Sequence, residues 1–460
     1  MKMRLRNVDD GTASGVNPAT GVYQTMQCDG IDVLVFIVLM FLNSAVMPWL
    51  WKADIKSAFR RCPLRSAHQQ FAAVVFLVAG VPHIAVNKTL NFGAVASVHG
   101  WHRVSSALLQ FMRIFFRLVV CRYVDDYFGV TRSSQLAPSR VMGVVFSALG
   151  FGVDPEKSED FMSVLVILGA KLTIRWTKKA LSLGLDDGKM RRWMAELDQV
   201  LLVGVLTPAL AMKFVGRFLW AASLTADKVG RSNLKALMAQ IHDPTRGYKL
   251  STWARRSLVF WRKFLLSQPQ IWKSVDECKR QHMISWTDAA GTGELAALLY
   301  DQRRDTFVYT TLTCPPVIMD QWLRRGDDYI GLLELVAVVM CLHTWRAELH
   351  NKLWTTWQDN AGVMHAVAKG GTSGVLHDAN EILNMLWLDV HHNQTGLFVA
   401  KVESEANIAD EPTREITDIF ASLEATWTAP KLPQWLLQLW AVRPQAVSFR
   451  GEEEPPVSME

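Results

Sequence analysis

The sequence contains few cysteines, and they are not spaced as metal ligands or as a disulfide framework. Its six cysteines are scattered over 460 residues without a C-x-x-C pair. This excludes a disulfide scaffold and argues against a structural zinc site. We interpret the cysteines as reduced structural thiols, and therefore expect an intracellular protein.

Long apolar runs and compositional bias are also absent. The longest apolar run, residues 33–42, has ten residues, whereas a membrane span needs about 20. We therefore predict a buried helix there and no contact with a membrane. The N-terminus is charged and turn-rich, unlike a signal peptide. Because 50% of the residues are hydrophobic, the chain can bury a sizeable core. Its 460 residues suggest about two to four domains of ~100–200 residues each.

Charge is present but unevenly distributed. The net charge of +6 comes from 49 basic and 43 acidic residues. Residues 171–280 contain 21 Lys and Arg against 8 Asp and Glu, whereas residues 281–460 contain 12 against 24. A basic segment of this kind is typical of a surface that neutralises phosphates. We expect the acidic C-terminal part to depend on its basic neighbour for binding nucleic acid.

The periodicity of apolar residues predicts an α+β multidomain protein. Helices and strands alternate over residues 1–185, and helices dominate residues 186–280, which end in a linker at 268–281. A second α/β mixture covers residues 281–428. The tail, residues 429–460, is predicted to be disordered because it ends in an acidic, proline-containing run.

Three aspartates in the first part lie at the ends of predicted strands. Asp54 ends a strand over residues 49–55, and Asp125 with Asp126 forms the tip of a hairpin between two apolar runs. Adjacent carboxylates repel one another, and Mg²⁺ prefers oxygen ligands of this kind. Two such ions can activate a hydroxyl and stabilise a leaving oxygen in phosphoryl transfer. The alternative is that the Asp-Asp pair only makes a polar hairpin turn.

Four carboxylates in the C-terminal part form a second candidate site. Asp288 and Asp359 end predicted strands, Glu334 lies on an apolar helix, and Asp410 follows Asn-Ile-Ala. A buried glutamate is costly unless it is paired or bound to a metal. Strand-end aspartates of an α/β domain commonly face one crevice. The alternative for Glu334 alone is a partly exposed helix residue.

Both constellations resemble the reverse transcriptases of retroelements. Asp-Ile-Lys-Ser-Ala-Phe at 54–59 resembles the first catalytic motif of that family, and Tyr-Val-Asp-Asp at 123–126 resembles its signature hairpin. The order Asp, Glu, Asp, Asp in the C-terminal part resembles ribonuclease H. The resemblance covers about 6–185 and 283–427 and is greatest to DIRS-type retrotransposons. It implies partial fingers and a ferredoxin-like palm, a helical thumb and connection, and a ribonuclease H-like domain.

The resemblance also implies roles for individual residues. Arg6 would grip the triphosphate, Phe59 would exclude a ribose 2′-OH, Gly93 would contact template and nucleotide, and Lys157 would lie near the triphosphate. From the residues alone, Phe59 would be a core aromatic and Lys157 a solvated loop lysine. The implied catalytic metal ligands, with two Mg²⁺ or Mn²⁺ ions per site, are Asp54, Asp125, Asp126, Asp288, Glu334, Asp359 and Asp410.

The function that the resemblance implies is RNA-directed DNA synthesis with removal of the RNA strand. The expected partners are an RNA template, a DNA primer, an RNA–DNA hybrid and dNTPs. The fingers motif that contains Arg6 lies at the start of the chain, so we expect a truncated enzyme or a piece of a polyprotein. Two alternatives stay open: an inactive remnant that only binds nucleic acid, and a nucleic-acid-binding module without catalysis.

Overall fold

The computed structural model is a mixed α+β protein that divides into two compact units. It describes residues 11–12, 14–132, 136–225, 227–242, 248–323, 329–372, 377–414 and 418–441. The first unit comprises Met1–Asp198 and Phe264–Cys278, and the second comprises Gln199–Lys263 and Lys279–Glu460. The helical part expected at 186–280 is therefore shared between the units rather than compact by itself.

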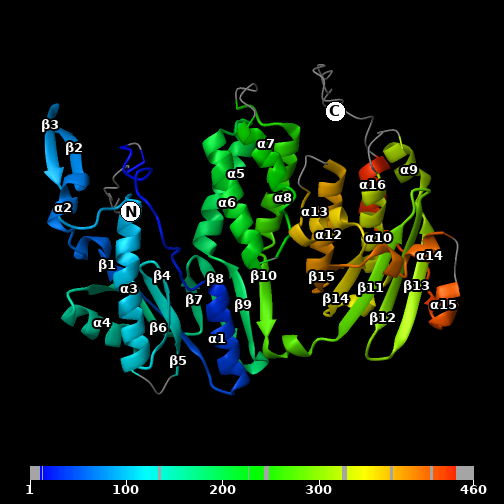
Figure 1. Cartoon of the computed structure of the whole chain (residues 1–460), viewed down its shortest axis with the longest axis horizontal. Helices are drawn as coiled ribbons and strands as arrows, with labels where there is room; N and C mark the ends of the chain where they lie inside the picture. Colours follow the sequence, from blue (N-terminus) through cyan, green and yellow to red (C-terminus); the bar gives the residue numbers. More distant parts are fainter. Residues whose placement is uncertain are drawn as a thin grey trace. The chain divides into compact units, whose positions relative to one another are not determined.

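The first unit contains an antiparallel sheet in the order β4-β5-β1-β6. Its strands are β1 (Trp49–Lys56), β4 (Val119–Tyr123), β5 (Asp126–Thr131) and β6 (Gly152–Met162). Two helices, α3 (Val95–Phe115) and α4 (Pro138–Ala148), cover one face (Figure 1). Because side chains alternate along a strand, Trp51, Ala53 and Ile55 are buried in the core against these helices. Lys52 and Asp54 consequently point to the opposite face.

A second antiparallel sheet of the first unit has the order β10-β9-β8-β7. Its strands are β7 (Val164–Ile167), β8 (Ala170–Arg175), β9 (Ala180–Leu185) and β10 (Gln270–Ser274). The predicted linker at 268–281 is wrong over β10, because Gln270 to Ser274 pair with β9 from Gly184 to Ala180. The apolar run at 33–42 lies within helix α1 (Ile31–Asn43), as predicted, and it contacts β9. No described helix is long and apolar enough to cross a membrane.

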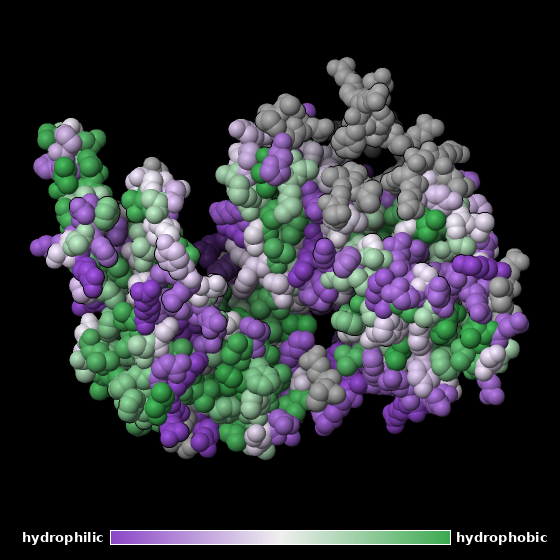
Figure 2. All heavy atoms as spheres, in the orientation of Figure 1, coloured by the Kyte–Doolittle hydropathy of each residue, from purple (hydrophilic) through white to green (hydrophobic). Residues whose placement is uncertain are grey.

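A separate hairpin of the first unit exposes apolar side chains. It consists of β2 (Ala73–Val78) and β3 (Val81–Val86), which follow the short helix α2 (Ser66–Gln69). Val75, Leu77 and Ile84 are exposed (Figure 2). The hairpin was not among the expected elements.

The second unit is built on a six-stranded mixed sheet in the order β15-β14-β11-β12-β13-β16. Strands β11, β12 and β13 form an antiparallel meander, and β14 and β15 continue it in parallel. Helix α10 packs on β11 and β12 and is buried along almost its whole length. The strands are β11 (His282–Ala289), β12 (Glu294–Asp301), β13 (Thr306–Thr313), β14 (Leu353–Gln358), β15 (Gly396–Lys401) and β16 (Thr426–Trp427).

The helices that follow β9 lie mainly in the second unit, except that most of α5 belongs to the first. They are α5 (Asp187–Val203), α6 (Pro208–Thr225), α7 (Leu234–His242), α8 (Thr252–Leu266), α9 (Pro316–Leu323), α10 (Ile330–Thr344), α11 (Arg346–Leu349), α12 (Ala361–Lys369), α13 (His377–His392), α14 (Asp410–Thr413), α15 (Asp418–Ser422) and α16 (Gln434–Ala441). The prediction of a disordered tail is wrong over α16. Its Leu436 is buried, and Trp435 Nε1 donates to Asp389 Oδ2 at 2.9 Å. Residues 442–460 lie outside the described part.

Strand β5 approaches β4 closely at Gly129. A Cβ atom at this position would overlap the carbonyl oxygen of Val119 and lie 3.0 Å from Trp51 Nε1. Gly129→Ala should therefore lower the free energy of unfolding by about 1–3 kcal/mol, measured by urea denaturation. Gly143→Ala in α4 is the control, because nothing lies within 4 Å of its added Cβ. That change should stabilise by up to about 1 kcal/mol, and equal effects would contradict the close packing at Gly129.

Candidate active sites

Three carboxylates form a row across neighbouring strands of the first sheet. Asp54 on β1 lies directly opposite Asp126 on β5 and Asp154 on β6. Directly opposed residues have Cβ atoms about 4.5–5.5 Å apart, and like charges in these positions destabilise the sheet. The sequence analysis missed Asp154, since only the pairing of β6 with β1 reveals its place beside Asp54.

The fourth carboxylate of this site, Asp125, lies at the tip of the β4–β5 hairpin. The hairpin is confirmed, but its turn lies one residue earlier than predicted. Tyr123 pairs with Asp126, so Val124 and Asp125 form the two-residue turn and Asp126 begins β5. Val124 has φ of 54°, which is rare for a β-branched residue and costs about 1–3 kcal/mol. Its carbonyl oxygen accepts hydrogen bonds from Trp101 Nε1 at 3.0 Å and Arg122 Nη1 at 3.3 Å. These contacts support the strained turn.

Lys157 supplies positive charge to the row of carboxylates. Its Nζ forms an ion pair with Asp54 Oδ2 and lies 4.0 Å from Asp154 Oδ2. Burial, followed by the charges of Asp125 and Asp54, raises the pKa of Asp126 from 3.8 to about 6, although Lys157 and Lys52 lower it in part. Desolvation and the neighbouring carboxylates therefore outweigh the two lysines, so Asp126 holds a proton more readily than an ordinary aspartate does.

Phe59 is placed in the core of the first unit. It is 7% exposed, and its ring centroid lies 5.1 Å from that of Phe92 and 6.2 Å from that of Trp101. This is the packing of a core aromatic. Its role in excluding a ribose 2′-OH stays a prediction.

Gly93 is held by a residue far away in the sequence. It has φ of 99°, and its carbonyl oxygen accepts a hydrogen bond from Asn17 Nδ2 at 2.8 Å. Asn17 Oδ1 also accepts from Val95 N at 2.9 Å, at the start of α3. The N-terminal segment thus fixes the turn that contains Gly93. Arg6 lies outside the described residues.

The second unit brings its predicted carboxylates toward one end of the sheet. Asp288 is on β11 and Glu334 is near the start of α10, and both are only 5% exposed. Asp359 follows β14, and Asp410 begins α14. Burial and then the charge of Asp359, with a further contribution from Asp410, raise the pKa of Asp288 to about 6, whereas a hydrogen bond from Thr413 lowers it. These charge interactions show that the three aspartates lie near one another.

Two neutral side chains that were not predicted as site residues orient the carboxylates of the second unit. Thr413 Oγ1 donates to Asp288 Oδ2 at 3.0 Å, and Asn360 Nδ2 donates to Glu334 Oε1 at 3.1 Å. Asn360 Oδ1 meanwhile accepts from Gly362 N and caps helix α12. An asparagine directly after a strand and before a helix is a recognisable cap signal. Nothing comparable marks Thr413.

The chemistry of both sets fits a divalent cation. Their donors are carboxylate oxygens, which Mg²⁺ prefers, and Asp359 Oδ1 is buried without a hydrogen-bond partner among the described residues. However, no three Asp, Glu, His or Cys side chains of the described ranges converge closely enough to hold an ion together. Coordination by three side chains at once therefore requires side-chain rotation.

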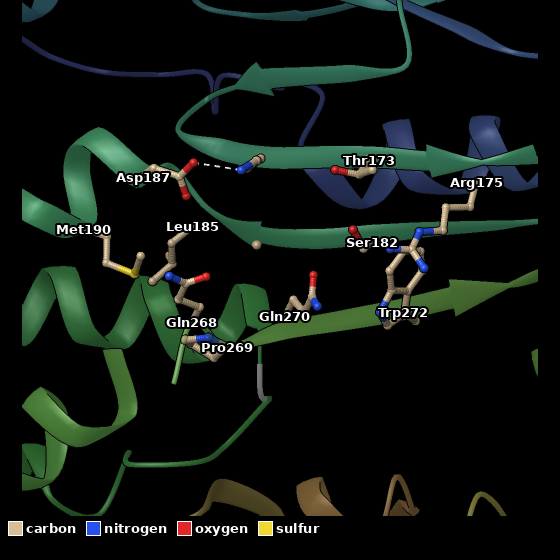
Figure 3. A pocket seen from close by; sticks show the side chains of 12 residues that line it. Thr173, Arg175, Ser182, Leu185, Asp187, Met190, Gln268, Pro269, Gln270 and Trp272 are labelled. Atoms are coloured by element: carbon tan, nitrogen blue, oxygen red, sulfur yellow. Dashed lines mark hydrogen bonds and ion pairs between the residues drawn. The ribbon is translucent and has the colours of Figure 1, made fainter. Parts of the chain in front are cut away.

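A cavity of about 170 Å³ lies on the polar face of the second sheet of the first unit (Figure 3). Arg175 stacks over Trp272 at 4.5 Å from its ring centroid, and Lys171 Nζ pairs with Asp187 at 2.8 Å. Ser182 and Gly184 are the small residues between them. The cavity thus combines cationic, aromatic and hydroxyl groups with the carboxylate of Asp187 and contains none of the predicted catalytic residues.

Comparison with known proteins shows a similar fold among solved structures but no family. No protein-family model matches the sequence, and no curated protein matches it. The structure is similar to the foamy viral protease-reverse transcriptase in complex with an RNA/DNA hybrid, with a TM-score of 0.38 and 12% identity. The similarity covers 89% of this chain and 47% of that chain, so this chain spans about half its length. No residue assignment rests on this similarity.

The pKa of Asp288 predicts how stability depends on pH without metal. Its pKa is about 6 in the folded chain and about 3.9 unfolded, so ionised Asp288 destabilises the fold above pH 6. In EDTA at pH 7.5, Asp288→Asn should stabilise by on the order of 2 to 3 kcal/mol. The gain should shrink as the pH falls from 6 to 4, as followed by thermal melting.

Asp389→Asn is the matched control for this prediction. Burial alone raises the pKa of Asp389, but hydrogen bonds from His343 and Trp435, with the charges of His343 and Arg346, lower it overall. Ionised Asp389 therefore stabilises the fold at neutral pH, and Asp389→Asn should lower the melting temperature at pH 7.5. Two variants that shift in the same direction would contradict these electrostatics.

Proposed function

We propose that the chain is an RNA-directed DNA polymerase with ribonuclease H activity, which copies retroelement RNA into DNA. The observation that supports this best is the direct register of Asp54 with Asp126 on adjacent strands, beside Asp125 at the hairpin tip. This placement joins the two motifs that resemble reverse transcriptases, although about 70 residues separate them. The second carboxylate set supports the nuclease activity.

In the first unit, Asp54, Asp125 and Asp126 would hold two Mg²⁺ or Mn²⁺ ions. Bound ions supply activation of a primer 3′-OH and stabilisation of the leaving pyrophosphate. The ammonium group of Lys157 is paired with Asp54. When a dNTP binds, this group can leave Asp54 and pair with an oxygen of the triphosphate instead. Arg6 would bind the same triphosphate. Phe59 and Gly93 keep the roles that the resemblance implies.

In the second unit, Asp288, Glu334, Asp359 and Asp410 would hold the ions that supply an activated water. The water would cleave the RNA strand of an RNA–DNA hybrid. Asn360 and Thr413 keep the carboxylates oriented through the hydrogen bonds described above. Such supporting contacts tune metal affinity by about 10–100-fold.

Binding without catalysis is the second candidate function. It is favoured by the ion pair between Lys157 and Asp54 and by the lack of a three-ligand group among the described side chains. In that case, the basic residues would bind nucleic acid and the carboxylates would carry out no chemistry. Turnover that depends on a divalent ion separates the two functions.

Two substitutions should separate the proposed activities. Asp125→Asn should lower primer extension on a homopolymer RNA template by at least about 100-fold, because a metal ligand matters more than its supporting contacts. Hybrid cleavage should be spared. Asp359→Asn should have the converse effect. Both reactions are followed with Mg²⁺ on the same preparations of the full chain.

The wild-type chain decides between catalysis and binding in the same assays. If it binds hybrid in a salt-sensitive manner but shows neither reaction, binding without catalysis is correct. If each substitution leaves its own activity unchanged, the site assignment is wrong.

The cavity on the second sheet should contribute to phosphate binding. Lys171→Gln and Arg175→Gln should each reduce the slope of log K against log salt for an RNA–DNA hybrid by about 1, measured by fluorescence anisotropy. Arg304→Gln on the exposed β12–β13 turn is the control and should leave the slope unchanged. Unchanged slopes for all three variants would place the phosphate contacts elsewhere in the chain.

A further inference from the structure

Arg122 is a buried cation directly behind the candidate catalytic hairpin. It is 2% exposed on β4 and lies opposite Tyr127, whose side chain is in the core. By strand alternation, its side chain is on the face opposite to Asp126. Burying a guanidinium is costly unless hydrogen bonds satisfy it. A role as a charged surface residue therefore cannot explain why an arginine occupies this buried position.

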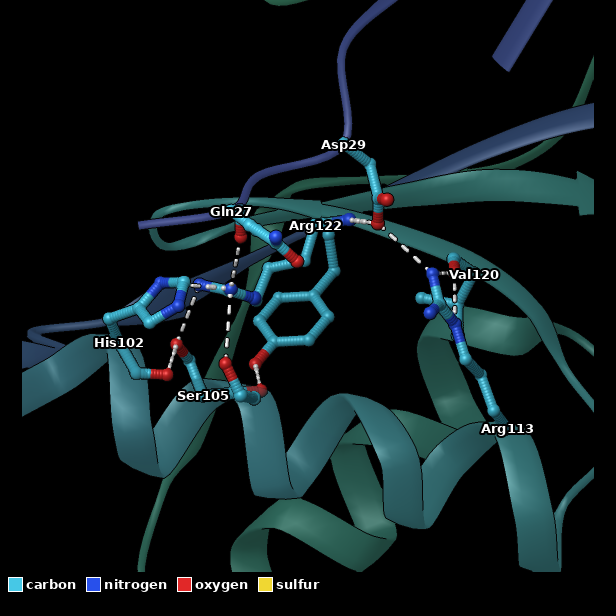
Figure 4. A network of polar contacts seen from close by, with 9 residues as sticks. Gln27, Asp29, His102, Ser105, Arg113, Val120 and Arg122 are labelled. Atoms are coloured by element: carbon cyan, nitrogen blue, oxygen red, sulfur yellow. Dashed lines mark hydrogen bonds and ion pairs between the residues drawn. The ribbon is translucent and has the colours of Figure 1, made fainter. Parts of the chain in front are cut away.

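The guanidinium of Arg122 contacts helix α3 and the segment of Gln27 (Figure 4), and it also reaches the turn at Val124. Its Nη1 donates to Ser105 Oγ at 2.8 Å and to Val124 O at 3.3 Å. Its Nη2 contacts helix α3 through His102 Nδ1 at 3.1 Å and Ser106 Oγ at 3.2 Å. A further bond, 3.2 Å long, reaches Gln27 O. The planar fork of arginine can serve several acceptors that lysine cannot serve together.

The acceptors around the guanidinium are neutral. Burial, then the charges of Arg122 and His99, lower the pKa of His102, so its neutral imidazole can accept the bond. The nearby carboxylate, Asp29 Oδ2, accepts instead from the main-chain N of Arg122 and from Arg113 Nη2, each at 3.0 Å. The side chain of Arg122 therefore holds neighbouring segments in place through hydrogen bonds to neutral groups and forms no ion pair with Asp29.

Asp29 also completes the outer edge of β4. The main-chain N of Asp29 donates to Arg122 O at 2.9 Å, and β4 is the end strand of its sheet. Segment 27–29 therefore protects an edge that would otherwise have unpaired main-chain groups. Both main-chain polar groups of Arg122 are thus bonded to Asp29, while β5 pairs with β4 on the other side.

We propose that Arg122 is a positioning residue that fixes the Val124 carbonyl and thereby aims Asp125 and Asp126 at Asp54. The Val124 carbonyl accepts hydrogen bonds from Trp101 of α3 and from Arg122 of β4. With that oxygen held, the turn keeps its left-handed conformation, and the aspartates keep their place relative to Asp54. The inference rests on the proposed palm site and adds a residue that does not touch substrate or metal.

The test compares Arg122→Lys with Arg113→Lys in the full chain. Arg122→Lys keeps the charge but loses the fork. Arg113 donates to Val120 O and Asp29 in the same network but does not bind the turn, so Arg113→Lys is the matched control. Binding of Mn²⁺ is measured by electron paramagnetic resonance. Only the bound Mn²⁺ that is lost in the Asp125→Asn variant is assigned to the site in the first unit. Primer extension gives kcat, and hybrid cleavage serves as an independent activity.

Arg122→Lys should weaken Mn²⁺ binding and lower kcat by about 10–100-fold, with hybrid cleavage unchanged and Arg113→Lys close to wild type. Equal effects of the two variants, or no effect of Arg122→Lys, would overturn the positioning role. If the wild type shows no primer extension, the polymerase proposal fails. The positioning role still stands if Arg122→Lys weakens Mn²⁺ binding and Arg113→Lys does not. Should Arg122→Lys not fold, Ser105→Ala decides: weaker Mn²⁺ binding supports the role, and unchanged binding overturns it.

Discussion

Repulsion between carboxylates on adjacent strands is the constraint on which the first unit depends. Asp54 faces Asp126 on one side and Asp154 on the other, an arrangement that weakens a sheet unless positive charge enters it. Lys157 offsets this repulsion by pairing with Asp54. Burial, together with the charges of Asp125 and Asp54, raises the pKa of Asp126 to about 6. A sheet that only had to be stable would have no reason to align these residues, so the alignment points to the proposed metal chemistry.

The second unit meets the same electrostatic problem in another way. Neutral donors, Thr413 and Asn360, bind Asp288 and Glu334, and the cation Arg414 pairs with the more exposed Asp410 at 2.9 Å. Burial and then the charge of Asp359, with a further contribution from Asp410, still raise the pKa of Asp288 to about 6, although the hydrogen bond from Thr413 lowers it in part. Both units thus keep a carboxyl that competes for a proton near neutral pH, as expected where a cation is to bind.

Much of the positive charge of the chain lies in a segment that contains none of the candidate catalytic carboxylates. Residues 171–280 are strongly basic, and Lys171 and Arg175 of this segment line the cavity on the second sheet. A basic surface attracts the phosphates of a polynucleotide over a distance, whereas the carboxylates act only on the atoms beside them. The proposed function therefore divides substrate binding from chemistry.

The sequence by itself determined the local features of this protein. Two apolar runs on either side of Asp125 and Asp126 predicted the hairpin, and a ten-residue apolar run predicted α1. Neighbours in the chain decide such elements. Tertiary structure alone decided which distant residues meet. Asp154 lies opposite Asp54, and Asn17 donates a hydrogen bond to the Gly93 carbonyl. Arg122 binds the Val124 carbonyl, and β10 pairs with β9 where a linker was predicted. Strand pairing and burial join residues tens of positions apart, and no local pattern records those partners.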